Sequence, residues 1–447
     1  MIDNKTFYKN VSILVLPMAM QNLINVGISS TDVIMLGKIG EKTLSGASLG
    51  SQVYFILNLI LFGLTSGASV LIAQYWGKKD MKTIHKIFGI EIKFAVIVSS
   101  LFMLATLFFT EPIMHIFSND AEVIREGVNY LHIVSFSYVL SAITMVYLNT
   151  MRSMERVKIA TVVYLCSLFT NIIANYLLIF TPLQLGVRGA AIGTCIARML
   201  ELLIVIFYDR KCNNVFRFQL QDLVAKDSVI LKDFLQFSMP VVFNELAWGT
   251  GVSAISAILG HLGSAATAAN SSAQVARQLA MVIGLGIANA AAIMIGKAIG
   301  EGKIDHARIF GKKFVQLSII TGILGSIVIL IARPLLLNFL VLTPTARDYL
   351  SSMMYVMAYF VIAQSFNTTL VVGIFRAGGD TRFGLLLDAS TLWGVAIVLG
   401  CIGAFLLKLP VIVVYMLLLS DEIIKLPLSF MRYRSYKWLK NVTKDNL

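Results

Sequence analysis

Three carboxylates in this sequence stand alone within long apolar segments. Asp32 lies in GISSTDVIMLG, Glu245 in NELAW and Asp388 in LLLDASTLWG. An ionised side chain inside a bilayer is costly unless it is paired, protonated or facing a wet cavity. A carboxylate of this kind can be neutralised by a proton, by Na⁺ or by a cationic solute, and these compete. The pattern therefore indicates cation exchange.

Neutral polar residues accompany these acids. Asn171 and Asn175 in TNIIANY are four residues apart, so they share one helical face, and Thr194 follows in the next apolar segment. Their oxygens could coordinate Na⁺ or hold a proton-carrying carboxyl, although amides in membrane helices also join neighbouring helices. Both interpretations remain open. Secondary candidates of the same polar kind are Asn22, Gln52, Gln364 and Asn367.

Other charges in apolar segments have simpler explanations. Arg198 and Glu201, three residues apart, are expected to neutralise each other. Asp421, Glu422 and Lys425 are expected near the end of the last apolar segment, where hydration or snorkelling accommodates charge.

The elements that carry these residues must be membrane helices. Of the 447 residues, 57% are hydrophobic and only 14% are charged, whereas soluble domains carry about 25% charged residues. A spanning helix needs about 20 mostly apolar residues. The sequence predicts an all-α polytopic membrane protein with twelve spans: 11–36, 47–75, 87–109, 128–150, 159–181, 187–208, 234–259, 265–296, 309–331, 350–374, 382–406 and 410–430.

The basic residues gather in alternate connections between the spans. Lys78, Lys79 and Lys82 lie in one such connection, and the C-terminal segment RYRSYKWLK is also basic. By the positive-inside rule both termini are cytoplasmic, which agrees with an even number of spans. We expect a multi-pass protein of the cytoplasmic (inner) membrane. The net charge of +13 follows from this topology and does not indicate nucleic acid binding.

The two halves of the sequence repeat each other. LPMAMQNLINVGISSTDVIMLGKIG aligns without a gap on MPVVFNELAWGTGVSAISAILGHLG, and Arg152 aligns with Arg376. Six spans per half predict a parallel repeat, an arrangement used by transporters. The predicted parts are an N-terminal six-helix lobe (1–208), a cytoplasmic linker (209–233), a C-terminal six-helix lobe (234–432) and a basic cytoplasmic tail (433–447). Asp32 aligns with Ile255, so the repeat itself does not require this carboxylate.

The residues give no indication of a cofactor or of catalysis. The four cysteines are scattered and fit neither a disulfide framework nor a metal site, and the five histidines form no hydrolase motif. We expect no enzyme activity and no metal site, apart from Na⁺ at Asp32 or Glu245.

The sequence resembles the multidrug and toxic compound extrusion (MATE) transporters over essentially its whole length. The resemblance rests on LPMAMQNLINVGISSTDVIMLGKIG, GASVLIAQYWGKKD and FRAGGDTRFG. It implies two six-helix lobes around a V-shaped central cleft, and export of organic cations and amphipathic drugs driven by Na⁺ or H⁺. The family's acids in the first and seventh spans match Asp32 and Glu245. Some members of the family carry Asp at the position where this chain has Asn175. Some also carry an acid in span ten, which this chain lacks, and Asp388 in span eleven is the candidate substitute for that acid.

From these observations we expect a secondary active multidrug antiporter that works by alternating access. It is expected to act as a monomer and to export cationic amphipathic small molecules. The alternative is a lipid-linked oligosaccharide flippase of the same broad superfamily. A flippase should have a markedly cationic cleft to hold a pyrophosphate, whereas the isolated charges here are mainly acids.

Overall fold

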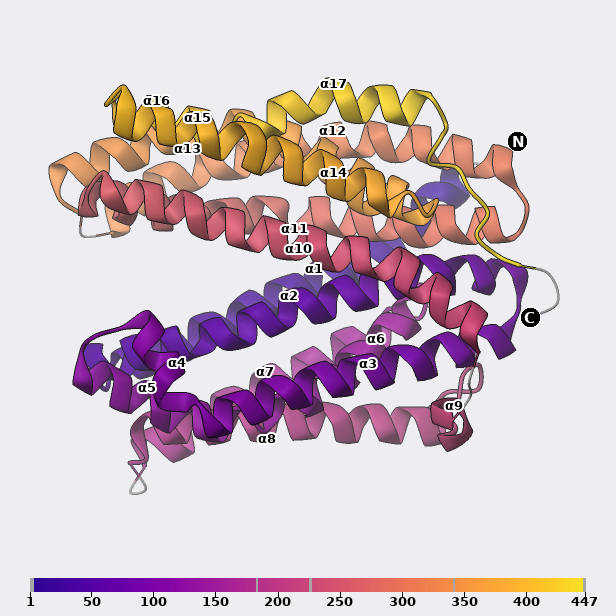
Figure 1. Ribbon diagram of the computed structural model, residues 1–447, viewed down its shortest axis with the longest axis horizontal. Coiled ribbons are helices and arrows are strands. Elements are labelled where there is room, and N and C mark those ends of the chain that lie inside the picture. Colours follow the sequence, from indigo (N-terminus) through magenta and orange to yellow (C-terminus); the bar gives the residue numbers. More distant parts are fainter. Residues whose placement is uncertain (1–3, 182–183, 225–226, 341, 445–447) are drawn as a thin grey trace. The chain divides into compact units, whose positions relative to one another are not determined.

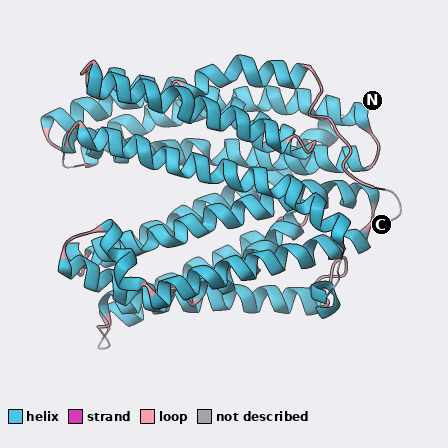
Figure 2. Cartoon of the chain, viewed as in Figure 1, coloured by secondary structure: helices cyan, strands magenta, loops and turns pink. Residues whose placement is uncertain are grey.

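The computed structural model describes residues 4–181, 184–224, 227–340 and 342–444, and the secondary-structure elements in these ranges are all helices, joined by loops and turns (Figure 2). The first half contains α1 (Asn4–Gly37), α2 (Glu41–Lys78), α3 (Met81–Phe108), α4 (Thr110–Phe117), α5 (Ala121–Val134), α6 (Ser137–Ser153), α7 (Lys158–Phe180), α8 (Gly186–Phe207), the π-helical turn η1 (Tyr208–Cys212) and α9 (Leu220–Val224). The second half contains α10 (Ser228–His261), α11 (Ser264–Gly300), α12 (Ile304–Phe339), α13 (Pro344–Thr368), η2 (Thr369–Phe375), α14 (Thr381–Thr391), η3 (Leu392–Ala396), α15 (Ile397–Cys401), η4 (Ile402–Leu406), α16 (Val411–Leu418) and α17 (Asp421–Arg434).

The helices follow the predicted spans in order and are consistent with them in number. Ten described helices are long and apolar enough to cross a membrane, and α5 with α6, bent by 52° at their junction, can form an eleventh span. The twelfth predicted span, 410–430, is divided between α16 and α17 by a break at Leu419 and Ser420. The described helices are thus consistent with twelve spans, and several extend beyond the predicted bounds, such as α1, which begins at Asn4.

Local sequence signals set several helix starts. Asp80 caps α3 by accepting a hydrogen bond from the Thr83 backbone N–H, and Asp120 caps α5 in the same manner. Thr343 caps α13, in which Pro344 occupies the first helical position, where a missing N–H costs nothing.

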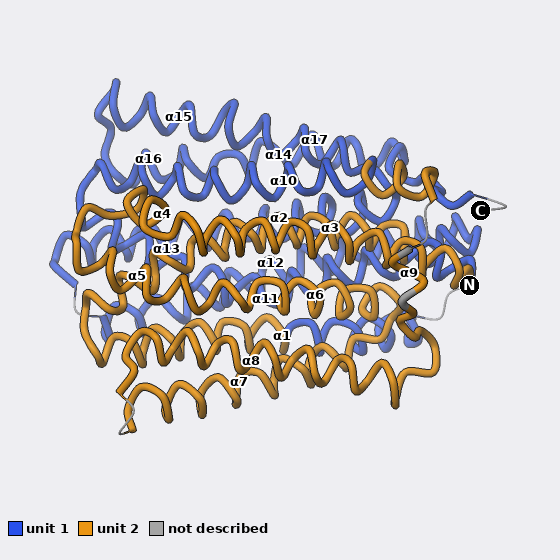
Figure 3. Tube along the Cα trace, turned by 60° about the horizontal axis from the view of Figure 1, so that its bottom comes forward, with its two compact units in different colours: residues 1–19, 73–79, 236–447 blue, residues 20–72, 80–235 orange. Residues whose placement is uncertain are grey.

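Contacts divide the chain into two compact units (Figure 3). Unit 1 comprises residues 1–19, 73–79 and 236–447, and unit 2 comprises residues 20–72 and 80–235. Helices α1, α2 and α10 therefore contribute residues to both units. The lobe boundaries at 208 and 234, drawn from the repeat, remain a prediction.

The segment expected to be a polar linker folds onto unit 2. Phe216 is fully buried, and its ring stacks on His85 with centroids 4.4 Å apart. His85 Nδ1 lies 2.9 Å from Asp222 Oδ2, close to the point where α9 packs on α3. Next to it, Lys86 Nζ donates to Asp227 over 2.9 Å, which lowers the pKa of that carboxyl below its ordinary value.

The C-terminal segment also packs against the helices. In unit 1, the Gln74 side chain donates to the carbonyl of Lys440 over 3.1 Å and accepts from the Val442 backbone N–H over 2.8 Å. Trp438 is fully buried, lies parallel to the Tyr433 ring at 6.1 Å and donates to the Tyr433 carbonyl. Asp380 accepts a bidentate pair of hydrogen bonds from Arg432. The described part of the predicted tail is therefore an ordered strap on unit 1, near the start of α1 (Figure 1).

Trp438→Ala should remove the side chain that fixes this strap. Loss of a fully buried aromatic side chain costs about 3 kcal/mol of unfolding free energy or more, so the melting temperature of the purified protein in detergent should fall. Limited proteolysis should then cleave the C-terminal segment faster. Lys437→Ala, at an exposed neighbouring position, is the control and should behave as wild type. Equal protease resistance of the two variants would contradict the conclusion that Trp438 holds this segment against the helices.

Candidate functional site

Asp32 lines a cavity of about 220 Å³ inside unit 2. Helix α1 places the partly buried carboxylate there, and α8 contributes Thr194 and Arg198. Tyr54 of α2 and Tyr130 of α5 also line the cavity. The structure therefore places Asp32 and Thr194 at the same cavity and gives the carboxylate access to a space large enough for water or a small solute.

Asn175 makes the direct contact with Asp32. Its side-chain N–H donates to Asp32 Oδ1 over 2.6 Å, and a second contact of 3.3 Å joins the same nitrogen to Asn171 Oδ1. Both asparagines are almost completely buried on one face of α7, as their spacing predicts. The Asn175 Oδ1 atom is buried and has no hydrogen-bond donor among the described residues. A proton or a cation at the carboxylate could use this acceptor.

Arg198 brings a positive charge to the wall of the same cavity. Its guanidinium donates to Glu201 Oε1 over 2.7 Å, as the spacing of these residues predicts. Within the described ranges, the Asp32 carboxylate forms no ion pair of its own. Arg198 is thus paired with Glu201, and the direct partner described for Asp32 is the Asn175 amide.

Gly193 allows α8 to approach the asparagine. A Cβ atom at this position would overlap Asn175 Oδ1 and lie 3.3 Å from the Asn175 backbone nitrogen. Only a residue without a side chain fits beside the amide. Gly193 was not among the predicted site residues, although it directly precedes Thr194 in the sequence.

Two secondary candidates in this unit are not among the described residues that line the cavity. Gln52 is exposed, and Asn22 is not among the cavity-lining residues that the structure describes. Gln21, next to Asn22, takes a structural position instead: it donates to the Val157 carbonyl over 3.1 Å and accepts from Arg152 over 3.0 Å.

In unit 1, Glu245 is not the isolated acid that the sequence suggested. Arg376 donates to Glu245 Oε1 over 2.8 Å, and both side chains are largely buried. These residues are 131 positions apart, so sequence spacing gave no sign of the pair. The repeat gives the comparison: Arg152, the counterpart of Arg376, bonds the neutral Gln21 in unit 2.

Asp388 is also paired, which corrects the expectation of an isolated acid. Lys425 Nζ lies 3.0 Å from Asp388 Oδ1, and the Asn244 side chain donates to Asp388 Oδ2 over 3.0 Å. Lys425 also contacts Asp421 at 2.9 Å. Both Asp421 and Lys425 are buried, so the expectation that hydration accommodates them is wrong. The break between α16 and α17 places the first turn of α17 inside the unit, where its charges need internal partners.

Of the secondary candidates, Asn367 joins this network and Gln364 lines a cavity beside it. The Asn367 amide donates to the Glu422 carboxylate over 2.9 Å and accepts from Ser429 over 3.1 Å. Gln364, Arg277 and Glu422 line a small neighbouring cavity of about 40 Å³. Sequence analysis missed Arg277 and Arg376 as members of the site. The run DEIIK, with acid and base four residues apart, was the available signal for Lys425.

The two units therefore present different electrostatics. Unit 1 holds Glu245 and Asp388 against Arg376 and Lys425, so its predicted acids already have cationic partners. Unit 2 offers Asp32 with an amide and a hydroxyl nearby and with space beside it. Of the predicted acids, Asp32 has the surroundings best suited to exchange a proton or a cation.

Gly193→Ala should displace the Asn175 amide from Asp32 and separate α7 from α8. Overpacking of this kind costs about 1–3 kcal/mol of stability, and the melting temperature should fall accordingly. Gly394→Ala is the matched control, because nothing lies within 4 Å of a Cβ at that position. If Gly193→Ala were as stable as Gly394→Ala, the close approach of the two helices would not hold.

Known proteins share this architecture. The family model MatE matches residues 17–177 and 240–402, one match in each half of the repeat. The protein named "Probable multidrug resistance protein NorM" of Rhizobium meliloti is 25% identical over 382 residues, covering 83% of this chain and 81% of that protein. An "Uncharacterized transporter YisQ" of Bacillus subtilis is 20% identical over 92% of this chain and 90% of its own length.

Solved structures agree in fold. A structure described as the outward-facing conformation of a multidrug resistance MATE family transporter superposes with a TM-score of 0.88 at 18% identity, covering 96% of each chain. A transporter of the MOP superfamily from Pyrococcus furiosus, whose description reports a reversed polarity of the binding pocket, gives 0.88 at 18% identity over 96% of this chain and 95% of its own. Since the family model matches well over half of the residues, the chain belongs to the multidrug and toxic compound extrusion (MATE) family of membrane transporters.

Proposed function

We propose that this protein is a secondary active exporter that moves organic cations or amphipathic drugs against H⁺ or Na⁺ by alternating access. The observation that carries the proposal is Asp32, a partly buried carboxylate that lines a cavity and has an amide as its direct partner. An acid in such surroundings can be neutralised by a proton or by a cation, and transport can be coupled to that exchange. The name of the Rhizobium meliloti relative, which refers to multidrug resistance, supports the substrate class.

Asn175 supports a switching role for Asp32. In the arrangement described, its N–H donates to the carboxylate, as an ionised acid requires. Its oxygen has no donor among the described residues and could accept from a protonated carboxyl after a rotation of the amide. Asn175 can therefore partner both states of Asp32, with Asn171 and Thr194 beside it.

We favour H⁺ over Na⁺ as the ligand of Asp32. Asp32 is the acid among the described residues that line this cavity, and Arg198 lies in the same wall. One carboxylate near a guanidinium is a weak site for a metal cation, whereas protonation needs no further negative ligand. Na⁺ at Glu245 would have to displace Arg376. Glu245 and Asp388, each paired with a cationic side chain, would instead rearrange their ion pairs within unit 1 when Asp32 changes its charge.

We place the protein in the cytoplasmic membrane as a monomer, with both ends of the chain in the cytoplasm. The basic connections between the apolar helices support this orientation. Pro17, inside α1, could let the helix bend during the cycle, because proline cannot donate to the helix ladder.

In proteoliposomes, wild-type protein should move ethidium in response to an imposed pH gradient, and Asp32→Asn should abolish that response. Loss of the exchangeable charge removes the coupling, which is typically worth a factor of about 5–150 in affinity. Substrate binding titrated against pH should show a transition in wild type and none in the variant. Separate Na⁺ gradients show whether Na⁺ can replace H⁺.

Asp348→Asn, an exposed carboxylate changed to an amide, controls for the substitution itself and should transport normally. The same pH dependence in wild type and Asp32→Asn would exclude Asp32 as the switch. Movement of lipid-linked sugars without movement of ethidium under any gradient would favour the flippase.

Glu245→Gln should leave folding nearly intact and lower the transport rate by about tenfold or more. The amide can still accept from Arg376, as Gln21 does from Arg152 in the other unit, so the buried arginine keeps a partner. The measurement is ethidium efflux normalised to the amount of monodisperse protein. Glu111→Gln, at an exposed position, is the control. Normal efflux from Glu245→Gln would reduce this ion pair to a packing role.

A further inference from the structure

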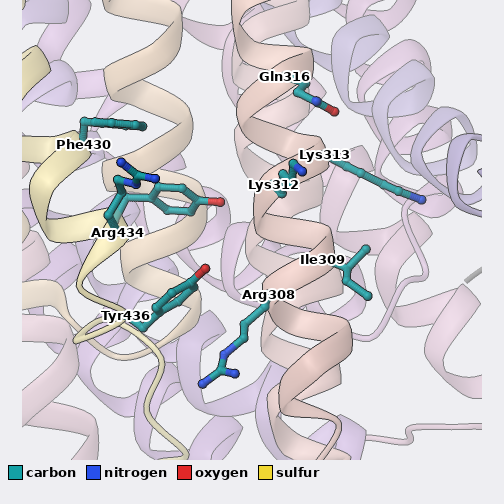
Figure 4. A pocket seen from close by; sticks show the side chains of 9 residues that line it. Arg308, Ile309, Lys312, Lys313, Gln316, Phe430, Arg434 and Tyr436 are labelled. Carbon is teal, nitrogen blue, oxygen red and sulfur yellow. The ribbon is translucent and has the colours of Figure 1, made fainter. Parts of the chain in front are cut away.

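A second concave site lies in unit 1, away from the predicted residues. It is an open groove of about 850 Å³ between the first turns of α12 and the end of α17 (Figure 4). Helix α12 contributes Arg308, Lys312 and Gln316, and the end of α17 with the residue pair that follows contributes Arg434 and Tyr436. Nothing in the proposed transport cycle uses this groove.

The groove is cationic. Arg308, Lys312 and Arg434 are exposed along it, and none of its described lining residues is acidic. The acid in contact with Arg308 is Asp305, at 3.5 Å, and it is almost fully exposed to solvent. Lys313 also lines the groove, and its ammonium lies 4.5 Å from the Phe7 ring centroid. Four basic side chains, three of them exposed, thus line a space that can hold an anion.

Aromatic rings hold two of these cations in place. The Arg308 guanidinium lies 5.0 Å from the Tyr436 ring centroid, and the Arg434 guanidinium lies 5.6 Å from that of Phe430. Such contacts fix a guanidinium while leaving its N–H groups available to an anion. Tyrosine rings beside basic side chains are typical of the membrane interface, where one end of the ring is apolar and the other wet.

An exposed apolar stripe continues from the groove along the same helix. After Gln316, the residues Ile320, Ile323 and Ile327 follow at intervals of four, three and four positions, so they share its face of α12. Their exposed fractions are 53%, 47% and 46%. In a membrane protein such a stripe contacts acyl chains. The cationic groove therefore opens onto a hydrocarbon-facing surface one to three turns farther along.

We propose that this groove binds the phosphate headgroup of an anionic phospholipid, with its acyl chains lying along the α12 stripe. Phosphate oxygens would accept from Arg308, Lys312 and Arg434, while Tyr433 and Tyr436 contact the glycerol region. Basic pockets between membrane helices bind anionic headgroups in this manner. The stripe is what favours a lipid over free phosphate, because a soluble anion gains nothing from it. The orientation proposed above places the groove at the cytoplasmic leaflet, but binding itself does not depend on that orientation.

The test compares two lipids with identical acyl chains. Delipidated protein in detergent is titrated with dioleoyl phosphatidylglycerol or dioleoyl phosphatidylcholine, and bound lipid is counted by native mass spectrometry. The phosphatidylglycerol should be retained in preference. The triple variant Arg308→Gln, Lys312→Gln, Arg434→Gln should lose about a hundredfold in phosphatidylglycerol affinity and the single variant Lys312→Gln about fivefold, with little change in phosphatidylcholine binding.

The matched control removes the same amount of charge elsewhere. Lys211→Gln, Lys303→Gln, Arg382→Gln changes three exposed basic residues outside the groove and should retain the wild-type preference. Equal losses in the two triple variants would overturn the site in favour of general surface charge. An excess of inorganic phosphate or glycerol 1-phosphate at constant ionic strength should not displace the lipid; efficient displacement by either would overturn the role of the stripe and assign the groove to a soluble anion.

Discussion

A carboxylate buried among membrane helices must be neutralised, and the architecture of this protein follows from the ways in which it meets that requirement. Each acid needs a proton, a cation or a set of hydrogen-bond donors, since water cannot solvate it there. Asp32 receives an amide donor and a cavity. Glu245 and Asp388 receive an arginine and a lysine. The first arrangement leaves a charge available for exchange, and the second holds its charges in internal pairs.

The repeat makes this difference informative. Arg152 and Arg376 occupy corresponding positions, yet Arg152 meets a glutamine and Arg376 meets a glutamate. The arginine is therefore common to both halves, and its partner is neutral in unit 2 and acidic in unit 1. At the position of Asp32 the acid is in unit 2 instead, because its counterpart in unit 1, Ile255, is a buried apolar residue. The same fold thus carries an ion-paired network in unit 1 and an open carboxylate in unit 2.

Small residues and helix breaks make these pairings geometrically attainable. Gly193 lets α8 come close enough for Asn175 to keep its orientation toward Asp32. The break between α16 and α17 brings Asp421, Glu422 and Lys425 into the interior of unit 1, where Lys425 reaches Asp388. At the other end of α17, Arg432 binds Asp380, and the buried Trp438 side chain holds the C-terminal strap against unit 1. One helix thus connects the charged interior of the unit with its ordered C-terminal segment.

The sequence by itself determined the membrane class, the order of the spans and the repeat. It also determined that Asp32, Asn171, Asn175 and Thr194 are polar residues within apolar helices. These follow from local properties: hydropathy over about 20 residues, helical spacing and alignment of the halves. The tertiary structure alone decided that Glu245 and Asp388 have cationic partners, that Gln52 is exposed and that the C-terminal segment is docked. The pairings and the docking depend on contacts between different helices and segments: Asp388 of α14 meets Lys425 of α17, Glu245 meets Arg376, 131 positions away, and Gln74 meets Val442, 368 positions away. Helical spacing fixes which residues share a face of one helix, but only the packing of helices determines what that face meets.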